Sequence, residues 1–181
     1  MATIQGATGI SEMTTSLSRL LKSISKGTSL LIDIREELSL LENYFTIQSY
    51  RYGGTITMDI QVDNESLYNS EIIKFTLQPL VENALYHGIK NKRGKGMIRI
   101  EGELDGEDCI LLITDNGKGM TPERLEQVRK GIRNRKVRET DIYGLYNVNE
   151  RIRLNFGENY GITITSCLLY TSPSPRDSTS S

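Results

Sequence analysis

The 181-residue sequence lacks a long hydrophobic run, a strong charge imbalance and a cysteine framework. No apolar stretch approaches the roughly 18 residues of a membrane-spanning helix, and the first residues lack the pattern of a secretion signal, so we expect a soluble chain. The 22 Lys and Arg against 23 Asp and Glu argue against nucleic acid as a partner. Cys109 and Cys167 lie in apolar runs without the paired spacing of a metal knuckle, so we expect two reduced structural thiols.

The first third of the chain predicts two helices. One apolar stripe with helical spacing consists of Ile10, Met13, Leu17, Leu20, Leu21 and Ile24. We expect Gly27 to end this helix. Asp33, followed three residues later by Glu36, has the spacing of a capping box for a second helix over about 34–51.

The remainder alternates between strand and helix patterns. Strands are predicted at 55–62, 97–104, 109–114 and 161–166, with the middle two forming a hairpin, and helices at 77–88, 121–131 and 145–156. We expect the charged stretch 132–141 to be mobile and the tail 167–181 to be disordered or non-native. This order predicts an α+β fold, in which a mixed sheet carries helices on one face and follows a helical hairpin.

Three polar motifs interrupt these patterns. In the 77–88 helix, Asn83 and His87 share a face, next to Glu82. This group fits either a solvated helix edge or a base beside a magnesium ligand, because Mg²⁺ prefers oxygen ligands. Both interpretations remain open on this motif alone.

The second motif, Asp-Asn-Gly-Lys-Gly-Met over 115–120, ends a hydrophobic strand. Gly117 and Gly119 permit a sharp turn and a close backbone approach, although Asp-Asn-Gly is also a common hairpin signal. The Asp115 carboxylate can accept a hydrogen bond from an exocyclic amine such as that of adenine.

The third motif is Gly144 and Leu145, at the predicted start of the last helix. A glycine at such a junction exposes amide hydrogens to an anion, but an ordinary helix start explains it equally well. Basic residues without an acid between them precede the second motif: Lys90, Lys92, Arg93, Lys95 and Arg99. They agree with a phosphate ligand, although a charge run is usually a solvated face.

Taken in order, the three motifs resemble the asparagine box and the two glycine boxes of the GHKL ATPases. Their sequences are most similar to those of sensor histidine kinases of the YesM and LytS type. The resemblance covers roughly residues 10–166 and implies a two-layer Bergerat fold that binds ATP and Mg²⁺. It also implies a division into a partial dimerisation hairpin at 1–53, a catalytic domain at 54–166 and the tail at 167–181.

The resemblance implies a role for each site residue. Asp115 would hold the adenine amino group, and Gly117, Gly119 and Met120 would line the nucleotide. Glu82 would be the polar or basic group beside the phosphoacceptor. The remaining residues would serve the phosphates: Asn83 as the Mg²⁺ ligand, His87 and Lys90 nearby, and Gly144 and Leu145 through helix amides. The segment 121–141 would be a lid.

Two departures from the family pattern matter. The Pro-His-Phe-Leu-Tyr-Asn motif of the phosphoacceptor is absent, and His87 is the single histidine. We therefore expect a fragment that begins inside the hairpin and does not phosphorylate itself. In addition, Ile142 stands where the family usually has glycine, and its β-branch is expected to weaken phosphate binding or lid closure.

The leading hypothesis is therefore the ATP-binding domain of a two-component sensor histidine kinase, which transfers the γ-phosphoryl group to a histidine. It implies a response regulator as partner, a homodimeric parent protein in the bacterial membrane and a cytoplasmic location for this domain. The alternatives are a non-catalytic ATP-binding or dimerisation module, and a GHKL serine kinase of the anti-sigma type, which the helical segment before Gly53 disfavours.

Overall fold

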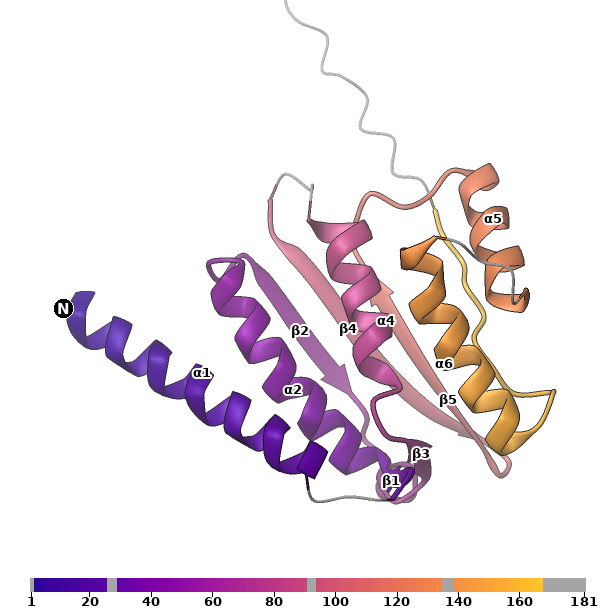
Figure 1. The fold of residues 1–181 in the computed structure, drawn as a ribbon, viewed down its shortest axis with the longest axis horizontal. Coiled ribbons are helices and arrows are strands. Elements are labelled where there is room, and N and C mark those ends of the chain that lie inside the picture. Colours follow the sequence, from indigo (N-terminus) through magenta and orange to yellow (C-terminus); the bar gives the residue numbers. More distant parts are fainter. Residues whose placement is uncertain (1, 26–28, 91–93, 135–138, 168–181) are drawn as a thin grey trace, which may run out of the picture.

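A three-stranded mixed sheet forms the centre of the fold. The computed structural model describes residues 2–25, 29–90, 94–134 and 139–167. The sheet has the order β2 (Ile56–Gln61), β4 (Gly96–Asp105), β5 (Asp108–Asp115), with β2 parallel to β4 and β4 antiparallel to β5. Helices α2, α4 and α6 cover one face of this sheet (Figure 1). The predicted α+β fold class is confirmed.

Both predicted N-terminal helices are present, as α1 (Ala2–Ser25) and α2 (Ile34–Arg51). The Asp33 side chain caps α2 by accepting the backbone N–H of Glu36 at 2.7 Å, as the capping-box spacing predicts. Helix α1 packs on α2, but its apolar residues Ile10, Leu17, Leu21 and Ile24 are between 50% and 65% exposed. These four residues of the predicted stripe are therefore exposed, whereas Leu20 packs against the core.

The main core lies between the sheet and the helices α2 and α4 (Leu77–Asn83). The fully buried side chains that fill it include Ile34, Leu67, Leu85, Ile98 and Ile100. A boundary at residue 53 falls between α2 and β2, which share this core. The division into 1–53, 54–166 and 167–181 stays a prediction.

A second cluster joins the C-terminal helices α5 (Pro122–Arg133) and α6 (Thr140–Phe156). Its buried members are Val128, Ile132, Ile142 and Leu145. The expectation of a mobile stretch beginning at residue 132 is wrong at its start, because Ile132 is helical and only 3% exposed. Residues 135–138 of that stretch lie outside the described part of the chain.

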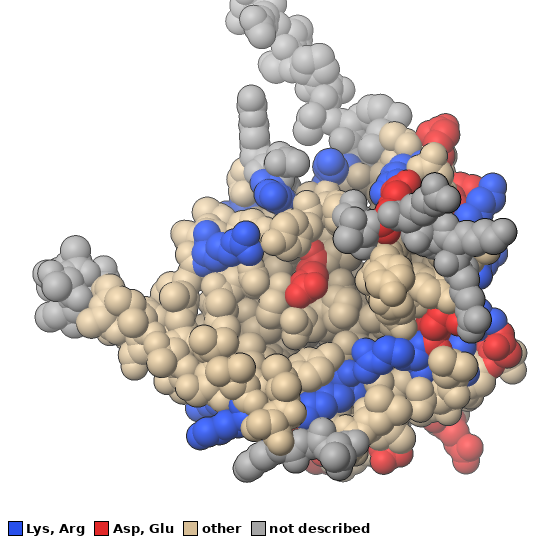
Figure 2. Space-filling model, in the orientation of Figure 1, with Lys and Arg blue, Asp and Glu red and all other residues tan. Residues whose placement is uncertain are grey.

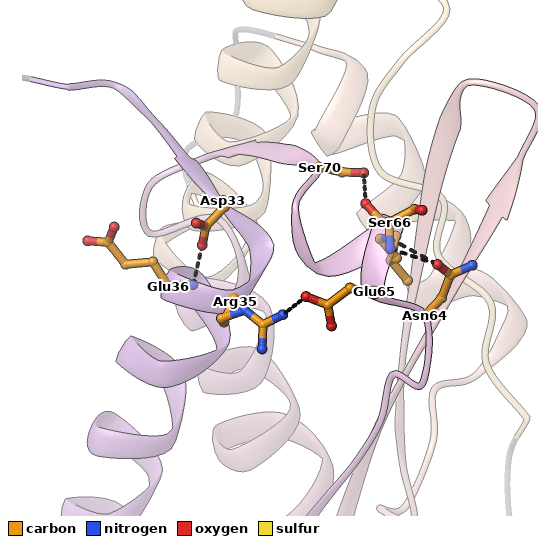
Figure 3. A network of polar contacts seen from close by, with 8 residues as sticks. Asp33, Arg35, Glu36, Asn64, Glu65, Ser66 and Ser70 are labelled. Carbon is orange, nitrogen blue, oxygen red and sulfur yellow. Dashed lines mark hydrogen bonds and ion pairs between the residues drawn. The ribbon is translucent and has the colours of Figure 1, made fainter.

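Three short elements were not predicted: β1 (Leu31–Asp33), α3 (Glu65–Tyr68) and β3 (Glu71–Ile73), with β1 and β3 paired antiparallel. Figure 3 shows the polar network that fastens α3 to the start of α2. The Asn64 side chain caps α3, and Arg35 of α2 pairs with Glu65 at 2.6 Å. These contacts fix the first turn of α2 against the chain that leads to α4.

The predicted closing strand at 161–166 is wrong. This segment is extended but has no strand partner among the described residues. Side chains make hydrogen bonds to its backbone in place of a neighbouring strand. The Asn149 side chain accepts the N–H of Ile162 at 2.8 Å, and the Arg129 side chain donates to the carbonyl of Ile164 at 2.9 Å. The alternation of apolar residues therefore predicted one half-buried side correctly, but it did not imply a hydrogen-bonded strand neighbour.

Both cysteines are free thiols, as predicted. Cys109 is half-buried on β5, where burial raises the pKa of its thiol, and Cys167 is exposed. Within the described ranges, every helix is too short or too polar to cross a bilayer.

Candidate functional site

The helix that carries the first motif changes its geometry in the middle of that motif. Helix α4 ends at Asn83 and continues as the π-helical turn η1 (Ala84–Ile89), which closes with a bond from the Lys90 N–H to the Leu85 carbonyl at 2.9 Å. The π form is rare, and it occurs frequently at functional sites. Pro79 lies in the first turn of α4, where its missing N–H leaves no helical hydrogen bond unmade, and the helix continues one residue past Gly88.

The first and second motifs meet at two glycines. A β-carbon on Gly117 would lie 2.3 Å from the Cα atom of Gly88, closer than real side chains approach. The backbone N–H of Lys118 also donates to the carbonyl of Gly88 at 3.1 Å. The loop after β5 therefore rests directly on η1, and glycine at both positions permits this approach.

Asp115 stands at this junction. A β-carbon on Gly88 would lie 2.4 Å from Oδ1 of Asp115, and the same oxygen accepts the N–H of Gly117 at 2.8 Å. The next residue, Asn116, accepts the N–H of Met97 at 2.8 Å and so ties the loop to β4. The carboxylate is exposed, held at the carboxyl end of β5 beside η1, and accessible to a ligand.

The rest of the second motif leads toward the C-terminal helices. Gly119 has φ +72°, a conformation that favours glycine. Met120 packs against the cluster of α5 and α6, and its N–H donates to the Ser166 hydroxyl at 2.8 Å. The motif therefore links the junction at Gly88 to α5 and α6.

Glu82 lies near two polar side chains. The Gln78 side chain, one turn earlier in α4, donates to the Glu82 carboxylate at 3.2 Å. Burial, together with the negative charge of Glu82, raises the pKa of the Tyr44 phenol of α2. The sequence interpretation missed both neighbours. The spacing of Gln78 and Glu82 in one helix was a usable signal, whereas Tyr44 had none.

Cations surround the end of η1. The ring of Tyr86 has the Lys90 ammonium 5.2 Å from its centroid and the Arg51 guanidinium 6.0 Å from it. His87 is exposed in the same turn. Basic side chains gather over this end of the molecule in Figure 2, at the top of the view. This surface suits an anionic ligand.

The third motif is placed differently from its prediction. Helix α6 begins at Thr140 rather than near 145, so Gly144 is its fifth residue and lies beyond the first turn, where the Tyr143 N–H already donates to the Glu139 carbonyl at 3.0 Å. Leu145 is 3% exposed and belongs to the α5–α6 cluster. The phosphate contact of these two residues stays a prediction, and in this structure their amides continue the helix.

A Mg²⁺ ion was expected on Asn83. In the described ranges, no group of three acidic, histidine or cysteine side chains is arranged as a metal site. The half-buried Asn83 offers one amide oxygen beside η1. This sparse set fits Mg²⁺, which usually takes one or two protein oxygens and completes its shell with phosphates and water.

A mixed sheet with helices on one face, a motif-bearing helix and a glycine loop at the end of β5 define a GHKL-type nucleotide-binding domain. Residues 68–179 match the family described as "Histidine kinase-, DNA gyrase B-, and HSP90-like ATPase", and the chain belongs to this family. Residues 1–56 match the family described as "Histidine kinase". The resemblance inferred from the three motifs is confirmed.

The similar proteins are sensor kinases. Sensor histidine kinase YesM of Bacillus subtilis is 34% identical over 159 residues, which are 87% of this chain and 25% of YesM. Sensor histidine kinase YpdA of Escherichia coli is 34% identical over 132 residues, which are 72% of this chain and 22% of YpdA. Sensor protein kinase HptS of Staphylococcus aureus is 31% identical over 150 residues, 83% of this chain and 28% of HptS. The chain spans about a quarter of the length of these relatives.

Proposed function

We propose that this chain is the ATP-binding catalytic domain of a two-component sensor histidine kinase. The observation that carries the proposal is the contact of Gly88 with Gly117, which brings the asparagine-box helix and the first glycine box into one site beside Asp115. Family membership supports a nucleotide as the ligand. The kinase names of the relatives support a histidine as the acceptor.

Each part of the nucleotide has a proposed partner. The Asp115 carboxylate accepts a hydrogen bond from the adenine amino group. Asn83 holds Mg²⁺, which neutralises phosphate charge when it is bound. Lys90 and His87, which are exposed at the end of η1, are the proposed contacts at the phosphate end. Gly144 and Leu145 reach the phosphates only after the start of α6 rearranges, since their amides are helical here.

The proposed reaction is phosphoryl transfer from ATP to a histidine supplied by another segment. A neutral imidazole nitrogen forms a bond to the γ-phosphorus, and the bond from this phosphorus to the β,γ-bridging oxygen breaks, so ADP leaves with the electron pair. The other ring nitrogen loses its proton to the Glu82 carboxylate, which acts as the base. Positioning and charge neutralisation supply most of the acceleration.

The binding step is tested by titrating the chain with Mg²⁺ and ATP. Saturable binding to the wild type is expected, with loss of binding in Asp115→Asn, because the amide nitrogen of asparagine opposes the adenine amino group as a second donor. Asp105→Asn is the matched control, since Asp105 lies at the far end of the same hairpin. Undiminished affinity in Asp115→Asn removes the adenine assignment.

The transfer step is tested by mixing the chain with a separately made acceptor-helix fragment and labelled ATP. Acid-labile, base-stable label on the fragment identifies phosphohistidine and supports the kinase. Saturable ATP binding without transfer favours the non-catalytic module, and label on serine favours the anti-sigma type. The response regulator, the membrane location of the parent protein and its homodimer belong to this proposal. The exposed apolar stripe of α1 supports the homodimer.

A further inference from the structure

Helices α4 and α6, which carry the first and the third motif, lie side by side on the sheet and run in opposite directions (Figure 1). Arg151, in the second half of α6, reaches the chain just before α4. Leu80, in the middle of α4, packs against the α5–α6 cluster, whose members from α6 lie in the first two turns of that helix. Asn83 of α4 therefore lies at the same end of the helix pair as Gly144 of α6.

One hydrogen bond fixes the opposite end of this pair. The Arg151 guanidinium donates to the backbone carbonyl of Lys74 at 2.6 Å, three residues before α4 begins. A hydrogen bond from a charged donor is stronger than one between neutral groups. Arg151 and Lys74 are both half-buried, so water competes with this bond less than it does at an exposed site.

The turn that accepts the bond is held in place by other parts of the chain. The Glu37 carboxylate of α2 accepts the N–H groups of Phe75 and Leu77, both at 2.8 Å, and so caps the start of α4. The N–H of Lys74 donates to the Leu30 carbonyl at 2.9 Å. Phe75 has φ +59°, a conformation that a bulky residue keeps only when its surroundings hold it. The bond from α6 therefore ends on a fixed point at the start of α4.

The anchor of α6 and its proposed phosphate contact lie on one side of the helix. Gly144 and Arg151 are seven residues apart, which is close to two helical turns, so they are separated by about 10 Å along the axis. On α4, Asn83 lies about 9 Å beyond Leu77. A bond at one end of both helices therefore sets how far apart Asn83 and Gly144 lie at the other end.

We infer that Arg151 is a positioning residue for the nucleotide phosphates: its bond to the Lys74 carbonyl fixes α6 against α4 and so sets the distance between Gly144 and Asn83. The inference rests on the proposed function, in which these two residues serve the phosphates. Arg151 acts through the two helices. The proposed rearrangement at the start of α6 leaves this bond in place, so the second half of the helix stays fixed while its first turn moves.

The adenine end of the site does not depend on this bond. Asp115 lies beside Gly88 of η1, and its carboxylate is held by the N–H of Gly117 in the loop after β5. Glu37 keeps the start of α4 capped whether or not α6 is anchored. Loss of the Arg151 bond is therefore expected to weaken phosphate binding and to leave adenine recognition intact.

The test compares wild type with Arg151→Met, which removes the donor and keeps a long side chain. Calorimetry measures Kd for ATP with Mg²⁺, and nuclear magnetic resonance titration measures Kd for adenosine, which has no phosphate. We expect Kd for ATP to rise about tenfold, the loss expected for one hydrogen bond from a charged group, and Kd for adenosine to stay within about twofold of wild type. Arg151→Gln, which shortens the side chain but keeps it polar, should show the same selective loss and replaces Arg151→Met if that variant does not fold.

Two further variants separate positioning from general damage. Arg153→Met is the matched control, because Arg153 is half-buried in the same helix but pairs with Glu150 at 3.3 Å, and it should bind both ligands as wild type does. Arg151→Lys keeps a charged donor and should recover most of the ATP affinity. A merely structural role would weaken both ligands by the same factor, since a smaller fraction of the chain would be folded.

Three results would overturn the inference. They are equal losses of affinity for ATP and adenosine in the Arg151 variants, wild-type ATP affinity in Arg151→Met and Arg151→Gln, and an Arg151→Lys variant that binds ATP no better than Arg151→Gln does. A wild type that binds ATP no more tightly than adenosine would also overturn it, because the phosphates would then make no contact to be positioned. A wild type that binds neither ligand would instead refute the proposed function itself.

Discussion

Ile142 of α6 occupies the space that Gly131 of α5 leaves open: a β-carbon on Gly131 would lie 2.5 Å from Cγ2 of Ile142. The isoleucine is 4% exposed and helical. A β-branched side chain is well tolerated in a buried helical position, so this departure from the usual glycine has a packing role in the conformation described. Its effect on ATP binding stays a prediction.

The first prediction concerns this pair. Gly131→Ala is expected to lower the free energy of unfolding by about 1–3 kcal/mol through overpacking, and Ile142→Ala by about 2–5 kcal/mol through a cavity. The double variant should be more stable than the sum of the two losses predicts, because the new methyl group partly fills the cavity. Urea denaturation measures all three.

Gly144→Ala is the matched control for that cycle. Gly144 lies inside α6, and a β-carbon there would meet nothing within 4 Å, so alanine should raise the free energy of unfolding by about 0.5–1 kcal/mol. If the loss of stability in the double variant equals the sum of the losses in Gly131→Ala and Ile142→Ala, the contact between the two residues is contradicted.

The second prediction concerns the junction of the two motifs. In Gly88→Ala the new methyl group displaces the Asp115 carboxylate, and ATP affinity is expected to fall at least about tenfold. Gly6→Ala in α1, where a β-carbon meets nothing within 4 Å, should bind ATP as wild type does. Calorimetric titration measures both, and wild-type affinity in Gly88→Ala would show that the position of Asp115 is unimportant.

The third prediction concerns Mg²⁺. Wild-type affinity for ATP should differ between buffers with Mg²⁺ and with EDTA, whereas Asn83→Ala should give similar values in both, because it lacks the amide ligand. Asn155→Ala is the control, since Asn155 is exposed at the end of α6 and donates to the Arg151 carbonyl. An unchanged Mg²⁺ response in Asn83→Ala would assign the metal to other oxygens.

The fourth prediction concerns pH and Glu37, which is 1% exposed. Desolvation raises the pKa of its carboxyl, although the N–H groups it accepts and the Arg151 guanidinium act in the opposite direction. Above the unfolded pKa, the native state then binds more protons than the unfolded state, so stability from this group falls as pH rises through the raised pKa.

The measurement is the difference in free energy of unfolding between wild type and Glu37→Gln, followed by urea denaturation from about pH 4.5 upward. Other titrating groups cancel in this difference. Wild type should lose stability relative to the variant as pH increases. The reverse trend would mean that the backbone donors and Arg151 outweigh desolvation.

Local signals in the sequence predicted local structure correctly. The predicted hairpin forms, with Leu104 opposite Cys109 and Gly106 at φ +63° in the turn between the strands. The Thr121 hydroxyl caps α5 by accepting the N–H of Arg124 at 3.2 Å. These features depend on residues two to four positions apart, which any fold containing them would bring together.

Signals that depend on distant partners were less reliable. The 161–166 pattern predicted a strand, but Asn149 and Arg129 replace the strand neighbour. The sequence predicts the start of α6 near residue 145, because Gly144 is interpreted as a junction between loop and helix. In the structure α6 begins at Thr140, and Ile142 in its first turn is buried in the α5–α6 cluster. Tertiary packing outweighs the weak preference of one glycine.

The amino-acid sequence alone determined the order of the three motifs, the caps and the hairpin, because these follow from neighbouring residues and from the periodicity of apolar side chains. Only the tertiary structure decided that Gly88 meets Gly117 and that Glu37 caps a helix 40 residues away. These contacts arise where helices and loops pack against one another, and the packing depends on the shape of the whole core.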